Sequence, residues 1–292
     1  MNINVIKNRK IYYCISLGII IIGLIMMAIS GLNYGIDFTG GTSIQIKIGK
    51  VITVDEARDI VDEYDKGASI VHIGANKDEI MIRSKKDFSN NEINDIIDKF
   101  VKKYDIKTKE FPAEKFGPFM GKEIRQKALL SASIAAVAML IYINWRFELK
   151  FAIAAIVALI HDVLIMFAVY SIFKIPVNGA FIAAILTILG YSINDTIVIF
   201  DRIREETKLN PRLSIEDIIN GSIKKSLTRT INTSITTLVA VLILYIVGVE
   251  DVKILALPLI FGIISGTYSS LFIASPIWYW LKSREKLNTK RA

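Results

Sequence analysis

Two carboxylates stand inside long apolar stretches of this sequence, where ionisable side chains are uncommon. Asp162 follows His161 near the middle of one stretch, and Asp195 lies six residues before the next charge, Asp201, in another. An ionisable residue at the centre of a membrane helix costs about 2.5–3.5 kcal/mol on insertion scales, and such residues commonly mark ion or proton pathways. Binding and release of a proton or a cation is therefore the chemistry that these positions could perform.

A basic residue and a series of hydroxyl groups occupy another apolar stretch. Arg229 begins it, and three threonines follow, Thr233, Thr236 and Thr237. Polar residues also surround Asp195, namely Tyr191, Ser192 and Asn194. Because an arginine can bury its stem along apolar surface while its charge stays solvated, Asp195 and Arg229 could meet if their helices are neighbours.

Two interpretations of this pair are open. Burial disfavours the charged form of a carboxylate, and an approaching cation favours it. Asp195 could therefore load and release a proton, or take a sodium ion as the coupling ion, while Arg229 approaches and withdraws. Alternatively, the two residues form a static ion pair that fixes helix packing. For His161 and Asp162 the favoured interpretation is local structure, a hydrogen bond between helices.

Helices that cross a membrane must position all of these residues. A helix needs about 20 largely apolar residues to cross roughly 30 Å of hydrocarbon. The predicted transmembrane helices are 11–30, 128–145, 151–173, 175–200, 230–249 and 254–281. The first could be a signal peptide, but it is too long for one and lacks a small-x-small cleavage site, so we expect it to be retained.

Composition supports a membrane protein and excludes several other classes. Hydrophobic residues make up 52% of the 292 residues and charged residues 22%, which argues against a soluble enzyme or a disordered chain. One cysteine and two histidines cannot form an internal disulfide or a Cys/His zinc site. Phosphate-loop, HExxH and GxSxG motifs are missing from the sequence. We therefore expect no enzyme activity and no cofactor other than the coupling ion.

The positions of the basic residues predict the orientation in the membrane. With a cytoplasmic N-terminus, the inside segments hold 17 Lys and Arg residues, whereas the two short outside loops hold only Lys174 and Lys253. This asymmetry predicts that 1–10, the loop 201–229 and the tail 282–292 are cytoplasmic. The surplus of +8 then reflects topology and affinity for membrane lipids, with no nucleic-acid partner.

The segment 31–127 is predicted to be a small extracytoplasmic α+β domain. Its expected elements are a strand at Thr42–Ile48, a helix from Thr53 to about Asp65, strands at Ser69–Ile73 and Glu79–Arg83, a helix from Ser89 to about Tyr104, and a last strand at Ile106–Phe111. Capping boxes, Thr53 with Glu56 and Ser89 with Glu92, mark the two helix starts. The order βαββαβ is typical of a ferredoxin-like domain, in which His72 is an ordinary strand residue.

Glycines and small residues mark two further features. The sequence GIDFTGGT at 35–42 includes Asp37, Gly40 and Gly41, and it is interpreted as a tight exit turn from the membrane, or as a binding element. In the last span the small residues Gly262, Gly266, Ser270 and Ala274 recur every four positions. Such a stripe lets two helices approach closely, so we expect helix packing there.

Four motifs together resemble the SecD/SecF protein-export family, and its SecF branch in particular. They are GIDFTGGT at 35–42, GYSINDTIVIFDRIREE at 190–206, SLTRTINTSITTL at 226–238 and GTYSSLFIASP at 266–276. The six spans, with one small domain after the first, are similar to that branch as well.

The resemblance implies more than the residues alone. It implies a half-transporter of the resistance-nodulation-division superfamily that pairs with SecD, works with the Sec channel and uses the proton motive force to promote late export of preproteins. Matched to the motifs, Asp195 would carry the proton and Arg229 would be its coupled cation. The alternatives are a small-molecule or lipid efflux transporter of the same superfamily and a non-conducting assembly subunit of the translocon.

Overall fold

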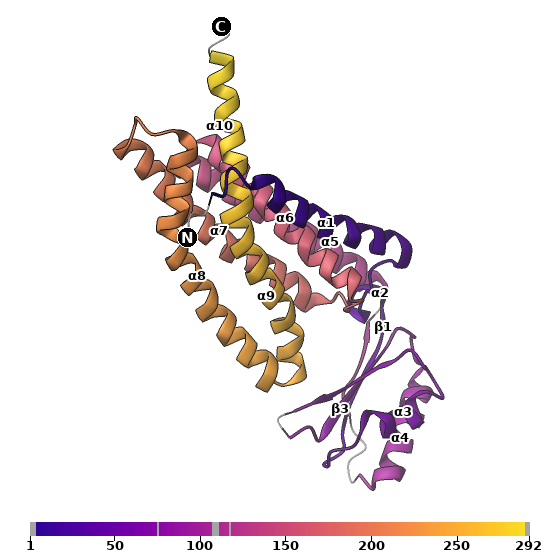
Figure 1. Ribbon diagram of the computed structural model, residues 1–292. Helices are drawn as coiled ribbons and strands as arrows, with labels where there is room; N and C mark the ends of the chain where they lie inside the picture. Colours follow the sequence, from indigo (N-terminus) through magenta and orange to yellow (C-terminus); the bar gives the residue numbers. More distant parts are fainter. Residues whose placement is uncertain (1–3, 75, 107–110, 117, 290–292) are drawn as a thin grey trace.

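A bundle of long helices carries a small sheet domain at one end (Figure 1). The computed structural model describes residues 4–74, 76–106, 111–116 and 118–289. Its long helices are α1 (Arg9–Ser30), α5 (Pro118–Arg146), α6 (Leu149–Ile172), α7 (Gly179–Leu209), α8 (Ile215–Val247), α9 (Glu250–Ser269) and α10 (Ser275–Thr289). Within the described residues, six helical segments are long and apolar enough to cross a membrane, which confirms the expected number.

The sixth segment, Val252–Arg284, combines α9 and α10. A single π-helical turn, η1 (Ser270–Ala274), joins these two helices. Pro258 lies inside α9, and Pro276 follows the π-helical turn in α10. Short π-helical turns occur often at functional sites, and this one lies beside the buried polar residues described below.

The segment 201–229, predicted as a cytoplasmic loop between two spans, is mostly helical. The helix α7 continues to Leu209 and α8 begins at Ile215, so only 210–214 are non-helical. Polar residues allow a helix to continue out of the membrane until Pro211 prevents it. Ser214 then caps α8 by accepting a hydrogen bond from the Asp217 amide at 3.0 Å.

The fourth span begins later than expected. The residues before Gly179 are not helical, because the Asn178 side chain accepts a hydrogen bond from the Phe181 amide at 3.0 Å and caps α7. Val177 instead forms a short parallel bridge with Tyr34, just after α1. The start of α7 is therefore held against the chain that leads into the sheet domain.

The sheet domain has the predicted βαββαβ order. Its elements are β1 (Gly41–Lys47), α3 (Val54–Val61), β2 (Ser69–Ile73), β3 (Glu79–Ser84), α4 (Asn90–Tyr104) and β4 (Ala113–Phe116). The four strands are antiparallel in the spatial order β2-β3-β1-β4, and α3 and α4 lie on one face (Figure 1). Ile44 and Ile82 pair across the sheet and share a buried core with Phe100 of α4. Both capping boxes form as predicted.

A strand that was not predicted, β4, lies after Pro112, and the predicted strand at Ile106–Phe111 falls mostly outside the described residues. Ile106 and Phe111 are non-helical, non-strand residues packed against the core, and 107–110 lie outside the described residues. Proline has no amide hydrogen to donate to a sheet. The Pro112 carbonyl accepts a hydrogen bond from the Gln45 amide at 3.0 Å, and β4 follows it at the sheet edge.

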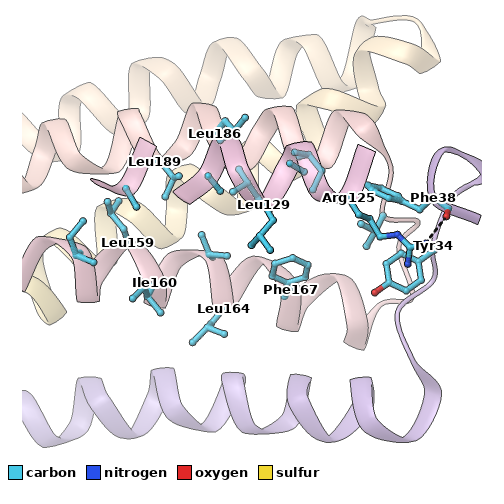
Figure 2. A pocket seen from close by; sticks show the side chains of 18 residues that line it. Tyr34, Phe38, Arg125, Leu129, Leu159, Ile160, Leu164, Phe167, Leu186 and Leu189 are labelled. Carbon is cyan, nitrogen blue, oxygen red and sulfur yellow. Dashed lines mark hydrogen bonds between the residues drawn. The ribbon is translucent and has the colours of Figure 1, made fainter. Parts of the chain in front are cut away.

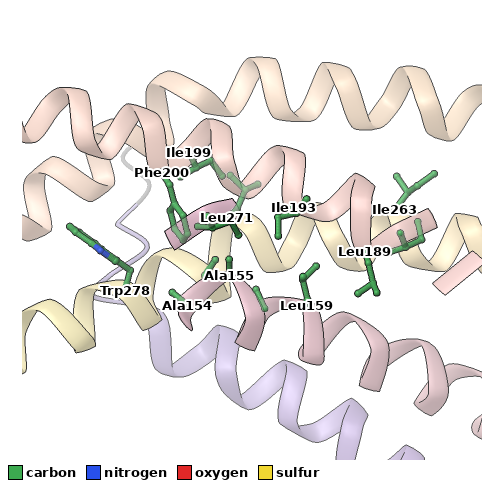
Figure 3. Packing of buried hydrophobic residues seen from close by; sticks show 14 of the residues in the cluster. Ala154, Ala155, Leu159, Leu189, Ile193, Ile199, Phe200, Ile263, Leu271 and Trp278 are labelled. Atoms are coloured by element: carbon green, nitrogen blue, oxygen red, sulfur yellow. The ribbon is translucent and has the colours of Figure 1, made fainter. Parts of the chain in front are cut away.

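Apolar side chains of α6, α7, α9 and α10 fill the centre of the bundle (Figure 3). Ala154 and Ala155 of α6 are almost fully buried, and small side chains there bring α6 close to its neighbours. The first helix approaches as closely, since a Cβ atom added at Gly23 would lie 2.2 Å from the Ala168 Cβ. The outward faces of α1 and α5 remain apolar and exposed, as lipid-facing surfaces do.

Candidate ion-coupling site

Asp195 lies in the interior of the bundle, where α7 meets α8 and α9. Its side chain is 3% exposed. The hydroxyl of Ser234 on α8 can donate to the Asp195 Oδ2 at 3.4 Å, and the Thr267 hydroxyl on α9 can donate to the Ser234 oxygen at 2.7 Å. The single Ser234 hydrogen also has the Thr230 carbonyl within 2.9 Å. The carboxylate of Asp195 is therefore held by one long and shared hydrogen bond.

Arg229 lies one helical turn before Ser234 on α8 and is exposed. Its charge acts on the Asp195 carboxylate, but the ion pairs between described residues do not include this pair. The structure thus places Asp195 and Arg229 on neighbouring helices, α7 and α8, without a direct contact between their side chains. The pair is separated in this conformation.

The hydroxyl groups of the three threonines after Arg229 donate to backbone carbonyls of their own helix, α8. The Thr233 hydroxyl donates to the Arg229 carbonyl at 2.9 Å, and the hydroxyls of Thr236 and Thr237 donate to the Thr233 carbonyl at 2.9 and 3.0 Å. Such bonds to the preceding turn are common for helical threonines. Tyr191 on α7 donates to the same carbonyl at 3.2 Å. Tyr191 therefore links α7 to α8, whereas the threonine hydroxyls do not reach Asp195.

Asp162 has a different environment, with four hydrogen-bonding side chains. Its two oxygens accept from Ser192 at 2.7 Å, from Ser265 and Ser269 at 2.8 Å, and from the His161 Nδ1 at 3.1 Å. The carboxylate is 1% exposed. This dense set of hydrogen bonds suits a structural link that joins α6, α7 and α9.

His161 extends the same network to the first helix. Its Nε2 lies 2.8 Å from the Ser16 hydroxyl of α1. In a neutral histidine whose Nδ1 donates to the Asp162 carboxylate, Nε2 accepts a hydrogen bond from the Ser16 hydroxyl. The interpretation of His161 and Asp162 as a hydrogen-bonded link between helices therefore matches their contacts.

Ser192 belongs to the Asp162 network, although its sequence position grouped it with Asp195. Sequence reasoning also missed Ser16, Ser265, Ser269 and Thr267. Two of these carried a signal, because Ser265 and Ser269 are spaced by one helical turn within an apolar span. Asn194 lies on the exposed side of α7.

A second polar link lies beside these networks at the π-helical turn. The hydroxyls of Thr196 and Ser270 are 2.8 Å apart, and the Ser270 hydroxyl donates to the Ser192 carbonyl at 3.1 Å. A Cβ atom at Gly262 would lie 2.3 Å from the Ile188 Cγ1, and one at Gly266 would lie 2.8 Å from the Ser192 Cβ. The small-residue stripe is therefore the surface on which α9 packs against α7.

The GIDFTGGT segment connects the sheet domain to the helix that carries Asp195. The Asp37 Oδ2 accepts a hydrogen bond from the Gly179 amide, at the start of α7, at 2.7 Å. Asp37 itself belongs to the short helix α2 (Ile36–Thr39), which also packs against α5. Gly40 has φ +79°, and Gly41 has φ +143° with its Cα so close to the Ser84 carbonyl that an added Cβ would collide with it. The segment is thus both a tight exit turn and a contact with α7.

Comparisons with known proteins agree with this architecture. The C-terminal region of the protein export membrane proteins SecD/SecF matches residues 96–284, and the SecD/SecF GG motif matches 25–50. The protein translocase subunit SecF of Calditerrivibrio nitroreducens is 40% identical over 291 residues, which cover 98% of this chain and 96% of that protein. The SecDF subunit of Bacillus subtilis is 34% identical, and the matched region covers 38% of the length of that protein.

Solved structures give the same result for the fold. The crystal structure of SecDF from Thermus, described as a translocon-associated membrane protein, superposes with a TM-score of 0.82 at 31% identity over 97% of this chain. A second SecDF structure, in a super-membrane-facing form, gives a TM-score of 0.75 at 30% identity. The chain spans 39% and 40% of these two SecDF chains.

Proposed function

The chain belongs to the SecD/SecF protein-export membrane family as a SecF subunit, and we propose that it couples the proton motive force to a late stage of preprotein export. It is a translocase subunit and not an enzyme. The observation that carries the proposal is the contrast between the two buried carboxylates. Asp162 is held by four donors, whereas Asp195 has one long and shared hydrogen bond.

Asp195 is the residue that changes protonation in this proposal. When it is charged, it attracts Arg229 and accepts the Ser234 hydrogen. When it is protonated, that attraction is lost and Ser234 can turn to the Thr230 carbonyl, which is already within 2.9 Å. The equilibrium between two arrangements of α7 and α8 then depends on proton occupancy, which is a population shift.

The sheet domain receives this movement by two routes. One runs along α7 to the Asp37–Gly179 hydrogen bond, over 16 residues or about 24 Å of helix. The other runs through the start of α9, which lies against β2. With both termini cytoplasmic, as the basic residues predict, the domain at 31–127 lies on the outer side and acts there on the emerging preprotein.

SecD is the proposed membrane partner. The relatives of this chain include SecDF proteins, in which both halves form one chain. On α7 and α8, polar and apolar side chains are exposed side by side, among them Asn194, Thr236, Ile235 and Ile243. Exposed polar groups in hydrocarbon are costly, so a second membrane chain over this surface suits it better than lipid. The Sec channel and the exported preprotein complete the proposed assembly.

A pulse-chase export assay tests the proposal in cells depleted of the native protein. We expect Asp195→Asn, at matched expression, to leave a preprotein as retained precursor. Asp201→Asn, a carboxylate on the same helix with 57% side-chain exposure, is the matched control and should export normally. Normal export by Asp195→Asn would favour the assembly-subunit alternative. Normal export with altered drug sensitivity would favour the efflux alternative.

A further inference from the structure

An apolar groove of about 400 Å³ opens on the side of the bundle between α5, α6 and α7 (Figure 2). This volume is within the range of small-molecule sites. Apolar side chains of the three helices line it, including Leu129, Ala132, Ile160, Leu164, Phe167 and Leu186. None of these residues takes part in the Asp195 or Asp162 networks, so the groove is separate from the ion-coupling site.

Polar groups line only one end of the groove. Arg125 and Tyr34 lie there, next to the junction with the sheet domain (Figure 2). The guanidinium of Arg125 donates to the Gly121 carbonyl at 3.2 Å and to the Phe38 carbonyl at 3.4 Å. These bonds use two of the five N–H groups of an arginine. Arg125 is exposed and can therefore bind a further acceptor.

The depth of the groove matches half a bilayer. It extends along α5 from Arg125 to Ala136, which is about 16 Å of helix. The hydrocarbon core of a membrane is roughly 30 Å thick, so the groove reaches from the membrane surface to near its midplane. An extended, apolar ligand with an anionic end fits this combination of depth, lining and charge.

We propose that the groove binds one acyl chain of an anionic phospholipid, whose phosphate is bound by Arg125. Arginine binds phosphate with charge-assisted and often bidentate hydrogen bonds. Lys122, three residues before Arg125 on α5, adds positive charge at this end of the groove, whereas Lys127 pairs with Glu123 at 2.7 Å. In the proposed orientation this lipid belongs to the outer leaflet. Because Arg125 also donates to Phe38 in α2, the bound headgroup touches the segment that connects the sheet domain to the bundle.

Lipid retention by the full chain, co-purified with its SecD partner, tests the site. Native mass spectrometry counts bound dioleoyl phosphatidylglycerol, with dioleoylglycerol as the analogue that lacks the phosphate. We expect one retained phosphatidylglycerol, weaker retention of dioleoylglycerol, and an affinity about tenfold lower in Arg125→Gln. Ala132→Trp, which fills the groove, should remove the site.

Matched controls lie on other faces of α5. Lys127→Gln removes a charge that is paired with Glu123, and Leu130→Trp adds a large side chain at a position that is 60% exposed; both variants should bind as the wild type does. Equal retention by all variants would overturn the proposal. Retention by the isolated chain but not by the complex would also overturn it, because a helix of the partner would then cover the groove.

Discussion

The Asp195 Oδ2 and the Ser234 hydroxyl face each other across α7 and α8 at 3.4 Å, near the outer limit of a hydrogen bond. Ser234 can instead donate to its own helix, and Thr267 of α9 donates to it. A serine hydroxyl with alternative acceptors thus lies between a buried carboxylate and a third helix. A change in the protonation of Asp195 can therefore alter the hydrogen bonds that α8 and α9 make through Ser234.

Replacing Arg229 should abolish coupled export. Arg229→Gln keeps a polar side chain but removes the charge that acts on Asp195, so export should fall to the level of Asp195→Asn. Thr236→Val is the matched control, because the Thr236 hydroxyl only bonds its own helix. The pulse-chase assay measures both, and normal export by Arg229→Gln would remove Arg229 from the mechanism.

Asp162 should contribute to stability where Asp195 does not. Asp162→Asn places an amide among three serine hydroxyls and a histidine, and a buried hydrogen-bonding group left without its partner costs about 1–3 kcal/mol. We expect a lower Tm in detergent for this variant and an unchanged Tm for Asp195→Asn. If both variants unfold at the wild-type temperature, the Asp162 network is not a structural link.

The close packing of α9 on α7 can be tested at one glycine. A methyl group at Gly262 would collide with Ile188, and overpacking of this kind costs about 1–3 kcal/mol. Gly262→Ala should therefore lower the thermal stability. Gly221→Ala on α8, where nothing lies within 4 Å of an added Cβ, should leave it unchanged or raise it. An equal thermal stability of the two variants would show that α9 can move away from α7 at little cost.

Acid should weaken the helices of the sheet domain. Hydrogen bonds from the Ser89 backbone and hydroxyl hold the pKa of Glu92 below its ordinary value of 4.5, and those of Thr53 do the same for Glu56. Carboxylates with a lowered folded-state pKa stabilise the fold above the unfolded-state pKa, and that stability is lost as the pH falls through the folded-state pKa. The contribution is therefore complete at neutral pH and decreases below about pH 4.5.

Hydrogen exchange of α3 and α4 in the full chain measures this effect. At each pH, protection in the wild type is compared with that in the double variant Glu56→Gln/Glu92→Gln. The difference between the two should be largest at neutral pH and should shrink in acid. A difference in protection that stays constant down to pH 3 would show that protonation of the capping carboxylates does not affect the stability of these helices.

The sequence predicted the elements of the fold well where local signals were strong. Capping boxes at Thr53 and Ser89 located both domain helices, and uncharged stretches located the six spans. The last strand was missed because Ala113–Phe116 is a short edge strand whose pairing with β1 is decided by tertiary contacts.

The candidate site was predicted in its main residues and not in its connections. Ser192 and Asp195 lie less than one helical turn apart, so spacing alone could not show that Ser192 bonds Asp162 across to α6. The threonines after Arg229 form a clear pattern, yet their hydroxyls bond their own carbonyls. Ser234 and Thr267 contact the site because of how α8 and α9 pack, which a single sequence does not specify.

Proton-dependent translocation in inside-out membrane vesicles distinguishes proton coupling by Asp195 from a purely structural role of this residue. Late-stage movement of a preprotein is measured with and without an imposed proton gradient, and with a sodium gradient in its place, for wild type, Asp195→Asn and Asp201→Asn. We expect the proton gradient to increase translocation in the wild type and in Asp201→Asn, and we expect Asp195→Asn to lose this increase. An equal increase in Asp195→Asn would contradict proton coupling at this residue.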